Sequence, residues 1–303
     1  TSSVRGEANF QDPQHFLKLQ LAWLAVSIIV ALALYRFDYH WWQKFGVPVA
    51  IVAGILLVLV IVPPFRHKVN GSYRWLRIGF VRIQPSEIAK FAVVVAMSLW
   101  MARMGRRASR WKEGFVFPLC GLGIVSVLIL LEPDFGTTVL TFVTGMAILF
   151  VGGARISYLF ALGGFGVCGI ALMVLQDPVR LVRILAFLWP DKYPAVTYHV
   201  TQSKFAFMAG GMWGVGLGNS IQKQLYLPEA HTDFILAIVG EELGFIATMG
   251  VIVLFIGILV CGITISLRAP DPFGRYLAFG LTIMLVLQAA INVGVVTGCL
   301  PPK

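Results

Sequence analysis

The chain has 303 residues, of which 58% are hydrophobic and 13% are charged, and its formal net charge is +10. This composition excludes a soluble globular protein, and apolar runs near the ~20 residues that cross a bilayer indicate a membrane protein with several α-helical spans. The runs do not alternate in hydrophobicity, which excludes a transmembrane barrel. No nucleic-acid-binding motif accompanies the positive charge, so we attribute it to anionic lipid head groups and an anionic substrate and expect no nucleic acid as partner.

The apolar runs predict an all-α, polytopic bundle of about eight membrane-spanning helices, which we expect to form a single integral membrane domain over residues 1–303. The expected spans are residues 17–35, 46–63, 86–104, 115–131, 136–153, 157–175, 234–266 and 275–297. The run from 234 to 266 would measure about 50 Å as one straight helix, too long for one crossing of a ~30 Å core. We therefore expect Gly240-Glu241-Glu242 to mark a break, or a portion of this helix to stand outside the core.

One large hydrophilic loop, residues 176–232, precedes this long run. The numbers of Lys and Arg residues on the two sides of the membrane are similar, so they do not fix the orientation. The concentrated cluster Arg103–Lys112 contains five Lys or Arg residues, and we place its side in the cytoplasm. Both termini and the loop 176–232 are then expected to be extracytoplasmic.

The four cysteines are widely spaced and form no Cys-x-x-Cys pair: Cys120, Cys168, Cys261 and Cys299. We interpret them as small buried hydrophobic residues, not as metal ligands or a disulfide framework. No spacing in the sequence defines a metal site, so the identity of any bound metal is unknown.

Asp233 stands where the polar loop becomes an apolar helix. A carboxylate at the membrane boundary is costly, so it needs a partner, water or a function, and at this position it can reach both a lipid head group and water. The alternative is that Thr232 or Asp233 simply caps the following helix, because a short side-chain oxygen satisfies an orphan backbone N–H.

Two further pairs of charged residues lie inside expected spans. Glu87 and Lys90 are neighbours on one helix face, which favours a buried ion pair over an interfacial pair with only positional value. Glu241 and Glu242 would point about 80° and 180° away from Asp233 on a regular helix, so both cannot share its face unless the helix breaks. We interpret these two carboxylates as supporting groups that form hydrogen bonds inside the bundle.

The stretch Tyr226-Leu-Pro-Glu-Ala-His-Thr-Asp233-Phe, followed by Gly240-Glu-Glu-Leu-Gly244, resembles the signature of the FtsW/RodA/SpoVE (SEDS) family of bacterial cell-wall synthesis. The resemblance covers nearly the whole chain and includes residues 84–90, 132–137, 214–223 and 291–298. Ala230 favours the division or sporulation branch. Trp189-Pro190 and Tyr198-His199 depart from the family pattern. Family members usually have ten spans, so we expect the first and last of them to be missing from this chain.

The resemblance implies a peptidoglycan glycosyltransferase that polymerises lipid II at the outer face of the bacterial cytoplasmic membrane, here at the division septum. Its implied partners are a class B penicillin-binding protein as transpeptidase and other divisome or elongasome membrane proteins. Asp233 matches the family's essential aspartate and is implied to activate the acceptor hydroxyl, as a general base or with the help of a metal. A divalent cation, Mg²⁺ or Mn²⁺, is implied by the resemblance alone.

A leaving pyrophosphate needs cationic groups on the extracytoplasmic side. The candidates in that region are Arg74, Arg77, Arg183, Lys204 and Lys223. Lys223 is favoured because it directly precedes the Asp233 signature, although for any one of these residues a solvated loop charge is the more common role. Trp75 and His231 are further candidates for substrate contact, and Trp75 can also be an interfacial aromatic residue.

Two other functions fit the same residues. Charges inside the membrane such as Glu87, Lys90 and Glu241 would also suit a lipid II flippase or another transporter of lipid-linked precursor. A scaffold that recruits a transpeptidase without activity of its own is a third possibility. The large loop that carries Asp233 favours chemistry at one face over transport.

Overall fold

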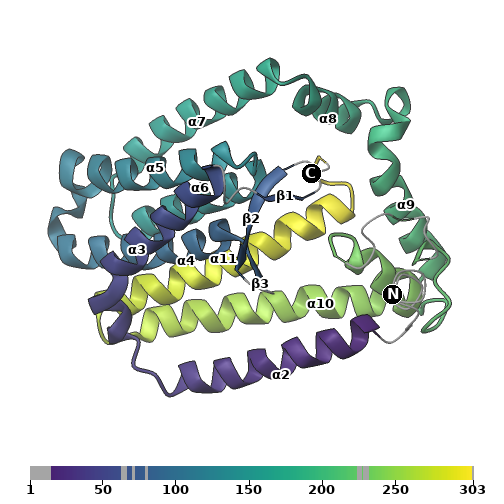
Figure 1. The fold of residues 1–303 in the computed structure, drawn as a ribbon, viewed down its shortest axis with the longest axis horizontal. Helices are drawn as coiled ribbons and strands as arrows, with labels where there is room; N and C mark the ends of the chain where they lie inside the picture. The colour runs from purple at the N-terminus through teal and green to yellow at the C-terminus, as the bar shows by residue number, and fades with distance from the viewer. Residues whose placement is uncertain are drawn as a thin grey trace. The chain divides into compact units, whose positions relative to one another are not determined.

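The computed structural model describes residues 15–62, 67–69, 72–78, 81–223, 227 and 232–301. The helices are α2 His15–Tyr35, α3 His40–Ile61, α4 Pro85–Met104, α5 Phe117–Leu131, α6 Phe135–Val151, α7 Ile156–Gln176, α8 Pro178–Leu188, α9 Pro194–Gly210, α10 Ile235–Arg268 and α11 Pro272–Val296 (Figure 1). Three short helical turns join them at Gly105–Ser109, Trp111–Val116 and Pro190–Lys192. The strands are β1 His67–Val69, β2 Ser72–Ile78 and β3 Val81–Ile83.

Each of the eight expected spans coincides with a helix. Within the described residues, six segments are long and apolar enough to cross a membrane: Leu17–Tyr35, His40–Ile61, Pro85–Ser109, Trp111–Leu131, Ile235–Arg268 and Pro272–Val296. The other two expected spans are α6, a shorter apolar helix of 17 residues, and α7, with 21 residues. The prediction of a helical membrane bundle is therefore confirmed.

A small antiparallel sheet is the main departure from an all-helical chain. Its order is β1-β2-β3, and β2 pairs with β3 in the register Arg77↔Arg82. The sequence pattern indicates only a basic loop in this region, because strands of 3 or 7 residues are too short to stand out in hydropathy.

The expected loop 176–232 contains two helices, α8 and α9, so it is not an irregular connection. Asp177 starts α8, because its carboxylate accepts hydrogen bonds from the backbone N–H groups of Val179 at 3.0 Å and Arg180 at 3.4 Å. Both helices begin with a proline, Pro178 in α8 and Pro194 in α9, where the missing N–H has no helical partner to lose.

The chain packs as two compact units. The first unit comprises residues up to 38, 170–256 and 289–303, and the second comprises residues 39–169 and 257–288. In the second unit, the core is built mainly on α4, whose Val94, Val95 and Met101 are fully buried. Gly280 of α11 allows close packing there, because a Cβ on it would lie 2.7 Å from both Val94 and Ile148. Small residues at such contacts are typical of membrane helices, whose association depends on close packing.

In the first unit, the end of α9, the start of α10 and the end of α11 share one cluster. Its buried residues are Ala206, Leu227, Phe234, Leu236, Ala237, Ile238, Val295 and Val296. The hydroxyl of Ser203 in α9 donates a hydrogen bond of 2.6 Å to the carbonyl of Val296. This packing fixes the point where α10 begins.

The expected burial of the cysteines was wrong for three of the four residues. Cys120, Cys261 and Cys299 are free and exposed, and the side chain of Cys168 lies outside the described residues. An apolar run in a membrane protein has an outer face that needs no protein neighbour, so hydrophobic surroundings in sequence do not imply burial in the protein.

Candidate active site

Asp233 is exposed in the turn that leads into α10, which begins at Ile235. The next residue, Phe234, is 8% exposed and stacks on the His199 imidazole of α9, with ring centroids 5.9 Å apart. From α11, Asn292 Nδ2 donates a hydrogen bond of 3.0 Å to the backbone carbonyl of Asp233. A buried neighbour and a donor from a second helix therefore fix the backbone of an exposed acidic residue.

The Glu87 and Lys90 side chains form an ion pair on α4, but the expected burial holds for Lys90 only, because the Glu87 side chain is 51% exposed. Lys90 is 3% exposed, and its Nζ lies 2.9 Å from Glu87 Oε1 and donates to Gln288 Oε1 of α11, also at 2.9 Å. The ammonium group thus has a carboxylate and an amide oxygen as partners, which a buried charge requires. That the pair lines a central cavity stays a prediction.

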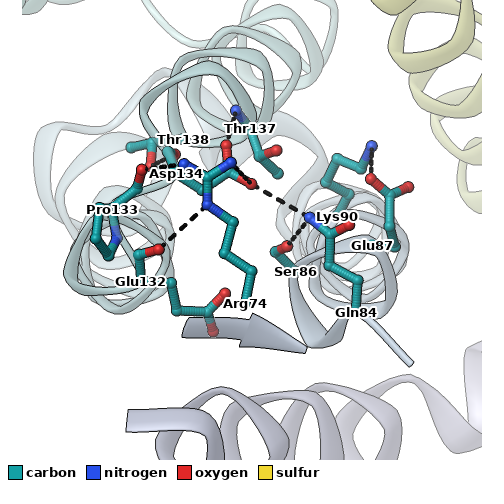
Figure 2. Close-up of polar contacts among 10 residues, drawn as sticks. All are labelled: Arg74, Gln84, Ser86, Glu87, Lys90, Glu132, Pro133, Asp134, Thr137 and Thr138. Carbon is teal, nitrogen blue, oxygen red and sulfur yellow. Dashed lines mark hydrogen bonds and ion pairs between the residues drawn. The ribbon is translucent and has the colours of Figure 1, made fainter. Parts of the chain in front are cut away.

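Asp134 joins the starts of two helices in the same unit (Figure 2). Its Oδ1 caps α6 by accepting from the Thr137 backbone N–H at 3.2 Å, and its Oδ2 accepts from Gln84 Nε2 at 3.2 Å. The same Gln84 nitrogen lies 3.0 Å from Ser86 Oγ at the start of α4. The motif that contains Gln84 and the motif that contains Asp134, some fifty positions apart in the chain, are therefore joined by the Asp134 carboxylate.

Arg74 ties strand β2 to the turn between α5 and α6. Its Nε donates to the backbone carbonyl of Glu132 at 3.4 Å, and its Nη2 donates to the carbonyl of Pro133. Its Nη1 lies 3.9 Å from Asp134 Oδ2, a weaker ionic contact. Trp75, the next residue of the strand, is half-buried. In this geometry the Arg74 guanidinium donates its hydrogen bonds to backbone carbonyls of the protein itself.

The carboxyl group of Glu132 lies buried in the same turn, with the residue 1% exposed. Neither of its oxygens has a hydrogen-bond partner among the described residues. Burial and, to a smaller extent, the nearby Asp134 charge raise the pKa of Glu132 to about 8, against an opposing effect of Arg74. The Glu132 side chain is therefore mostly neutral at pH 7.

The family model described as cell cycle protein, FtsW/RodA/SpoVE, matches residues 1–303. The chain belongs to the FtsW/RodA/SpoVE family. It is 43% identical over 299 residues to a probable peptidoglycan glycosyltransferase FtsW of Legionella pneumophila, covering 97% of this chain and 76% of the relative. It is 36% identical to the protein of the same name from Escherichia coli O6:H1, covering 98% of this chain and 72% of that one.

Solved structures of the FtsW/RodA/SpoVE family have the same fold. A chain from the structure described as "Structural coordination of polymerization and crosslinking by a peptidoglycan synthase complex" is 25% identical, with a TM-score of 0.77 over 93% of this chain and 79% of that one. RodA of Thermus thermophilus is 23% identical, with a TM-score of 0.67 over 96% of this chain and 79% of that one. The family and the apolar helices together show a multi-pass membrane protein.

Of the cationic residues considered for binding the pyrophosphate, Arg183 and Lys204 are exposed in the first unit. Arg183 of α8 and His199 of α9 both line a cavity of about 520 Å³. Lys204 of α9 lies against Gly298, because a Cβ on that glycine would meet the lysine side chain. Their contact with pyrophosphate stays a prediction.

The side chains of two other candidates lie outside the described residues. They are Arg77, whose backbone belongs to β2, and His231 in the Asp233 signature of the FtsW/RodA/SpoVE family. Their roles also stay predictions.

Lys223, the favoured candidate, is engaged with the protein. Its side chain is 6% exposed, and its Nζ lies 2.8 Å from Glu242 Oε1 and also donates to the carbonyl of Gly218. Glu241 lies beside it at 1% exposure and accepts hydrogen bonds from the same loop. The two carboxylates thus bind the loop that precedes the signature of the family.

Within the described residues, no three His, Cys, Asp or Glu side chains lie together as a metal-binding group. Glu229 and His231, the ionisable neighbours of Asp233 in the family signature, lie outside them. The described residues therefore do not test the expected Mg²⁺ or Mn²⁺, which stays a prediction from the resemblance.

Three residues that hold these contacts, Asp134, Asn292 and Gln288, were not predicted individually from the sequence. Asp134 and Asn292 stand inside motifs shared with the FtsW/RodA/SpoVE family, and a polar residue inside an apolar segment was the available signal for Asn292 and Gln288. Their partners could not be identified from sequence, because each contact joins two helices far apart in the chain.

Proposed function

We propose that this chain is a peptidoglycan glycosyltransferase that polymerises lipid II, the undecaprenyl-pyrophosphate-linked disaccharide-pentapeptide, into glycan strands for cell division. The observation that carries the proposal is its similarity, along nearly its whole length, to relatives named as probable peptidoglycan glycosyltransferases FtsW. The exposed acidic residue at the start of α10 supports it, since that position suits chemistry on a lipid-linked substrate.

Asp233 acts as the general base in this proposal. Its carboxylate takes the proton from the attacking sugar hydroxyl, whose oxygen forms a bond to the anomeric carbon of the donor. The bond from that carbon to the pyrophosphate breaks, and the pyrophosphate leaves with the electron pair. Asn292 holds the Asp233 backbone during this step. Arg183 and Lys204 are both exposed, and we assign to them the stabilisation of the leaving pyrophosphate.

The protein works in the bacterial cytoplasmic membrane with its catalytic face outside, and a class B penicillin-binding protein cross-links its product. The exposed basic residues Arg106, Arg107, Arg110 and Lys112, on a short connection between helices, support a cytoplasmic position for that side. The solved relative that belongs to a peptidoglycan synthase complex, in which polymerisation and crosslinking are coordinated, supports such a partner.

The test is polymerisation of purified lipid II by the full-length protein with its transpeptidase, comparing the wild type with Asp233→Asn. We expect glycan chains from the wild type and none from the variant, with equal thermal unfolding of the two proteins. Chains from both proteins would refute the role of Asp233. Chains from neither, with both folded and in complex, would refute the polymerase.

Lipid II transport is the alternative in that case. The nearly buried Lys90 on a membrane-spanning helix is the observation that favours it. A lipid-flipping assay in vesicles would then decide.

A further inference from the structure

Helix α10 is interrupted at Gly244, whose backbone has φ 81°. The backbone carbonyls of Glu241 and Glu242, which would accept helical hydrogen bonds from residues 245 and 246, accept instead from Val215 at 2.9 Å and Gly216 at 3.0 Å. Beyond the break, the Phe245 N–H donates to the carbonyl of Gly211 at 2.9 Å. The loop after α9 therefore fills the gap in α10.

The carboxylate of Glu241 binds the next part of this loop. Its Oε1 accepts from the backbone N–H groups of Ile221 at 2.9 Å and Gln222 at 3.4 Å, and its Oε2 accepts from the hydroxyl of Ser220. Ser220 is fully buried, so its bond to the Glu241 carboxylate forms away from solvent. A charged acceptor with three donors is among the strong hydrogen-bonding arrangements in proteins.

The carboxylate of Glu242 binds the end of the loop through Lys223. The two side chains are 10% and 6% exposed, and 2.8 Å separates their charged atoms. A buried charge that loses its partner is strongly destabilising, whereas loss of both charges together is tolerated much better. That difference provides a test.

We propose that Glu241 and Glu242 form a two-carboxylate clasp that holds the 214–223 loop and thereby positions the Asp233 segment for catalysis. The inference rests on the proposed glycosyltransferase function. Lys223 precedes Asp233 by ten positions, and it pairs with Glu242 of α10. Asp233 leads directly into the start of this same helix. The clasp holds the residues just before the signature, and Asn292 holds the backbone of Asp233. Lys223 is then a positioning residue and does not contact the pyrophosphate.

A double-mutant cycle separates these two roles of Lys223. Lys223→Met and Glu242→Gln should each lower kcat at least tenfold with little change in KM, because each leaves one buried charge unpaired. The combined variant should recover most of the lost activity. If Lys223 instead binds the pyrophosphate, Lys223→Met should raise KM, and adding Glu242→Gln should restore nothing. That result would overturn the proposal.

The exposed pair Arg110 and Glu113, 3.5 Å apart, provides the matched control. Arg110→Met, Glu113→Gln and their combination should leave kcat and KM unchanged. If the single clasp variants do not fold, thermal unfolding of the combined variant gives the answer, since a clasp predicts that it regains a cooperative transition. A combined variant no more stable than the singles would count against it.

Hydrogen exchange tests the clasp without any enzymatic readout. Glu241→Ala should speed exchange at the backbone amides of Ile221 and Gln222, whereas Glu113→Ala should not. Unchanged exchange there would overturn the proposal. Failure of the wild type to make glycan would refute the proposed function but would leave this measurement valid.

Discussion

Arg74 donates to the backbone carbonyl of Glu132, while the Glu132 carboxyl group, buried in the same turn, has no hydrogen-bond partner among the described residues. An arginine beside a glutamate would ordinarily favour the carboxylate form. Here the guanidinium donates to the backbone carbonyls of Glu132 and Pro133. The effect of burial on the Glu132 pKa therefore exceeds that of the arginine charge, and the side chain keeps its proton well above the ordinary pKa of a glutamate. Arg74 therefore fastens β2 without ionising its neighbour.

The Glu132 carboxyl should make stability fall as pH rises. Its pKa is about 8 in the folded protein, against an ordinary value of 4.5. Between these values the folded state holds a proton that the unfolded state has lost, so the stabilisation is complete below 4.5 and disappears as pH rises to 8. The slope is at most about 1.4 kcal/mol per pH unit. Thermal unfolding of wild type and Glu132→Gln in detergent from about pH 5 to 8.5 should show similar stabilities at low pH, where both side chains are neutral. The wild type should then become less stable than Glu132→Gln as pH rises, because only its side chain must ionise in a buried position.

Glu113→Gln is the control, because Glu113 lies in an exposed pair, and it should keep the wild-type dependence. A Glu132→Gln curve parallel to that of the wild type would show that the Glu132 carboxyl does not titrate in this range.

Asn292→Ala should lower kcat about tenfold and leave KM nearly unchanged. The change removes the donor to the Asp233 carbonyl, and a small misplacement of a catalytic group reduces rate more than binding. Steady-state kinetics with lipid II measure both constants, and thermal unfolding verifies that the variant is folded. A rise in KM at constant kcat would mean that Asn292 contacts the substrate instead.

Arg183→Gln should lower kcat about tenfold, because its positive charge is proposed to stabilise the pyrophosphate as negative charge develops on the leaving group. Arg183→Lys should retain most of the activity, because it keeps the charge. Arg180→Gln on the same helix is the control, since Arg180 is paired with Asp177 at 3.0 Å. Equal effects of Arg183→Gln and Arg180→Gln would show that only the general charge of α8 matters.

Gly244→Ala should destabilise the protein by about 1–3 kcal/mol or more. The backbone has a positive φ, and a Cβ would lie 2.4 Å from the carbonyl oxygen of Met212. Gly250→Ala on the same helix is the control, because a Cβ there meets nothing within 4 Å, and it should be neutral or slightly stabilising. Chemical or thermal unfolding in detergent compares the two. Similar stabilities would mean that the break is not required.

The membrane helices were predictable because length and apolarity are properties of continuous segments. α8 was missed because it lies inside a hydrophilic region, and β2 was missed because it is short. The break in α10 was expected at Gly240-Glu241-Glu242. It lies two residues further on, at Gly244, whose φ is positive.

The site was predictable only in part. The resemblance points to Asp233, whose role stays a prediction, and helical spacing predicted the contact between Glu87 and Lys90, which is local. The pairing of Lys223 with Glu242 depends on a loop folding back against a broken helix, and no pattern of spacing predicts that. The same holds for the bond from Asn292 to Asp233 and the bond from Gln84 to Asp134.

The interruption at Gly244 also bears on how this membrane protein is assembled. Hydrocarbon offers no water to satisfy an exposed peptide group, so the carbonyls of Glu241 and Glu242 need the N–H groups of Val215 and Gly216. Before the loop arrives, α10 can only be a continuous helix or bear unsatisfied groups. Insertion of α10 and docking of the loop are therefore coupled, and the segment that carries Asp233 acquires its final position only when both have occurred.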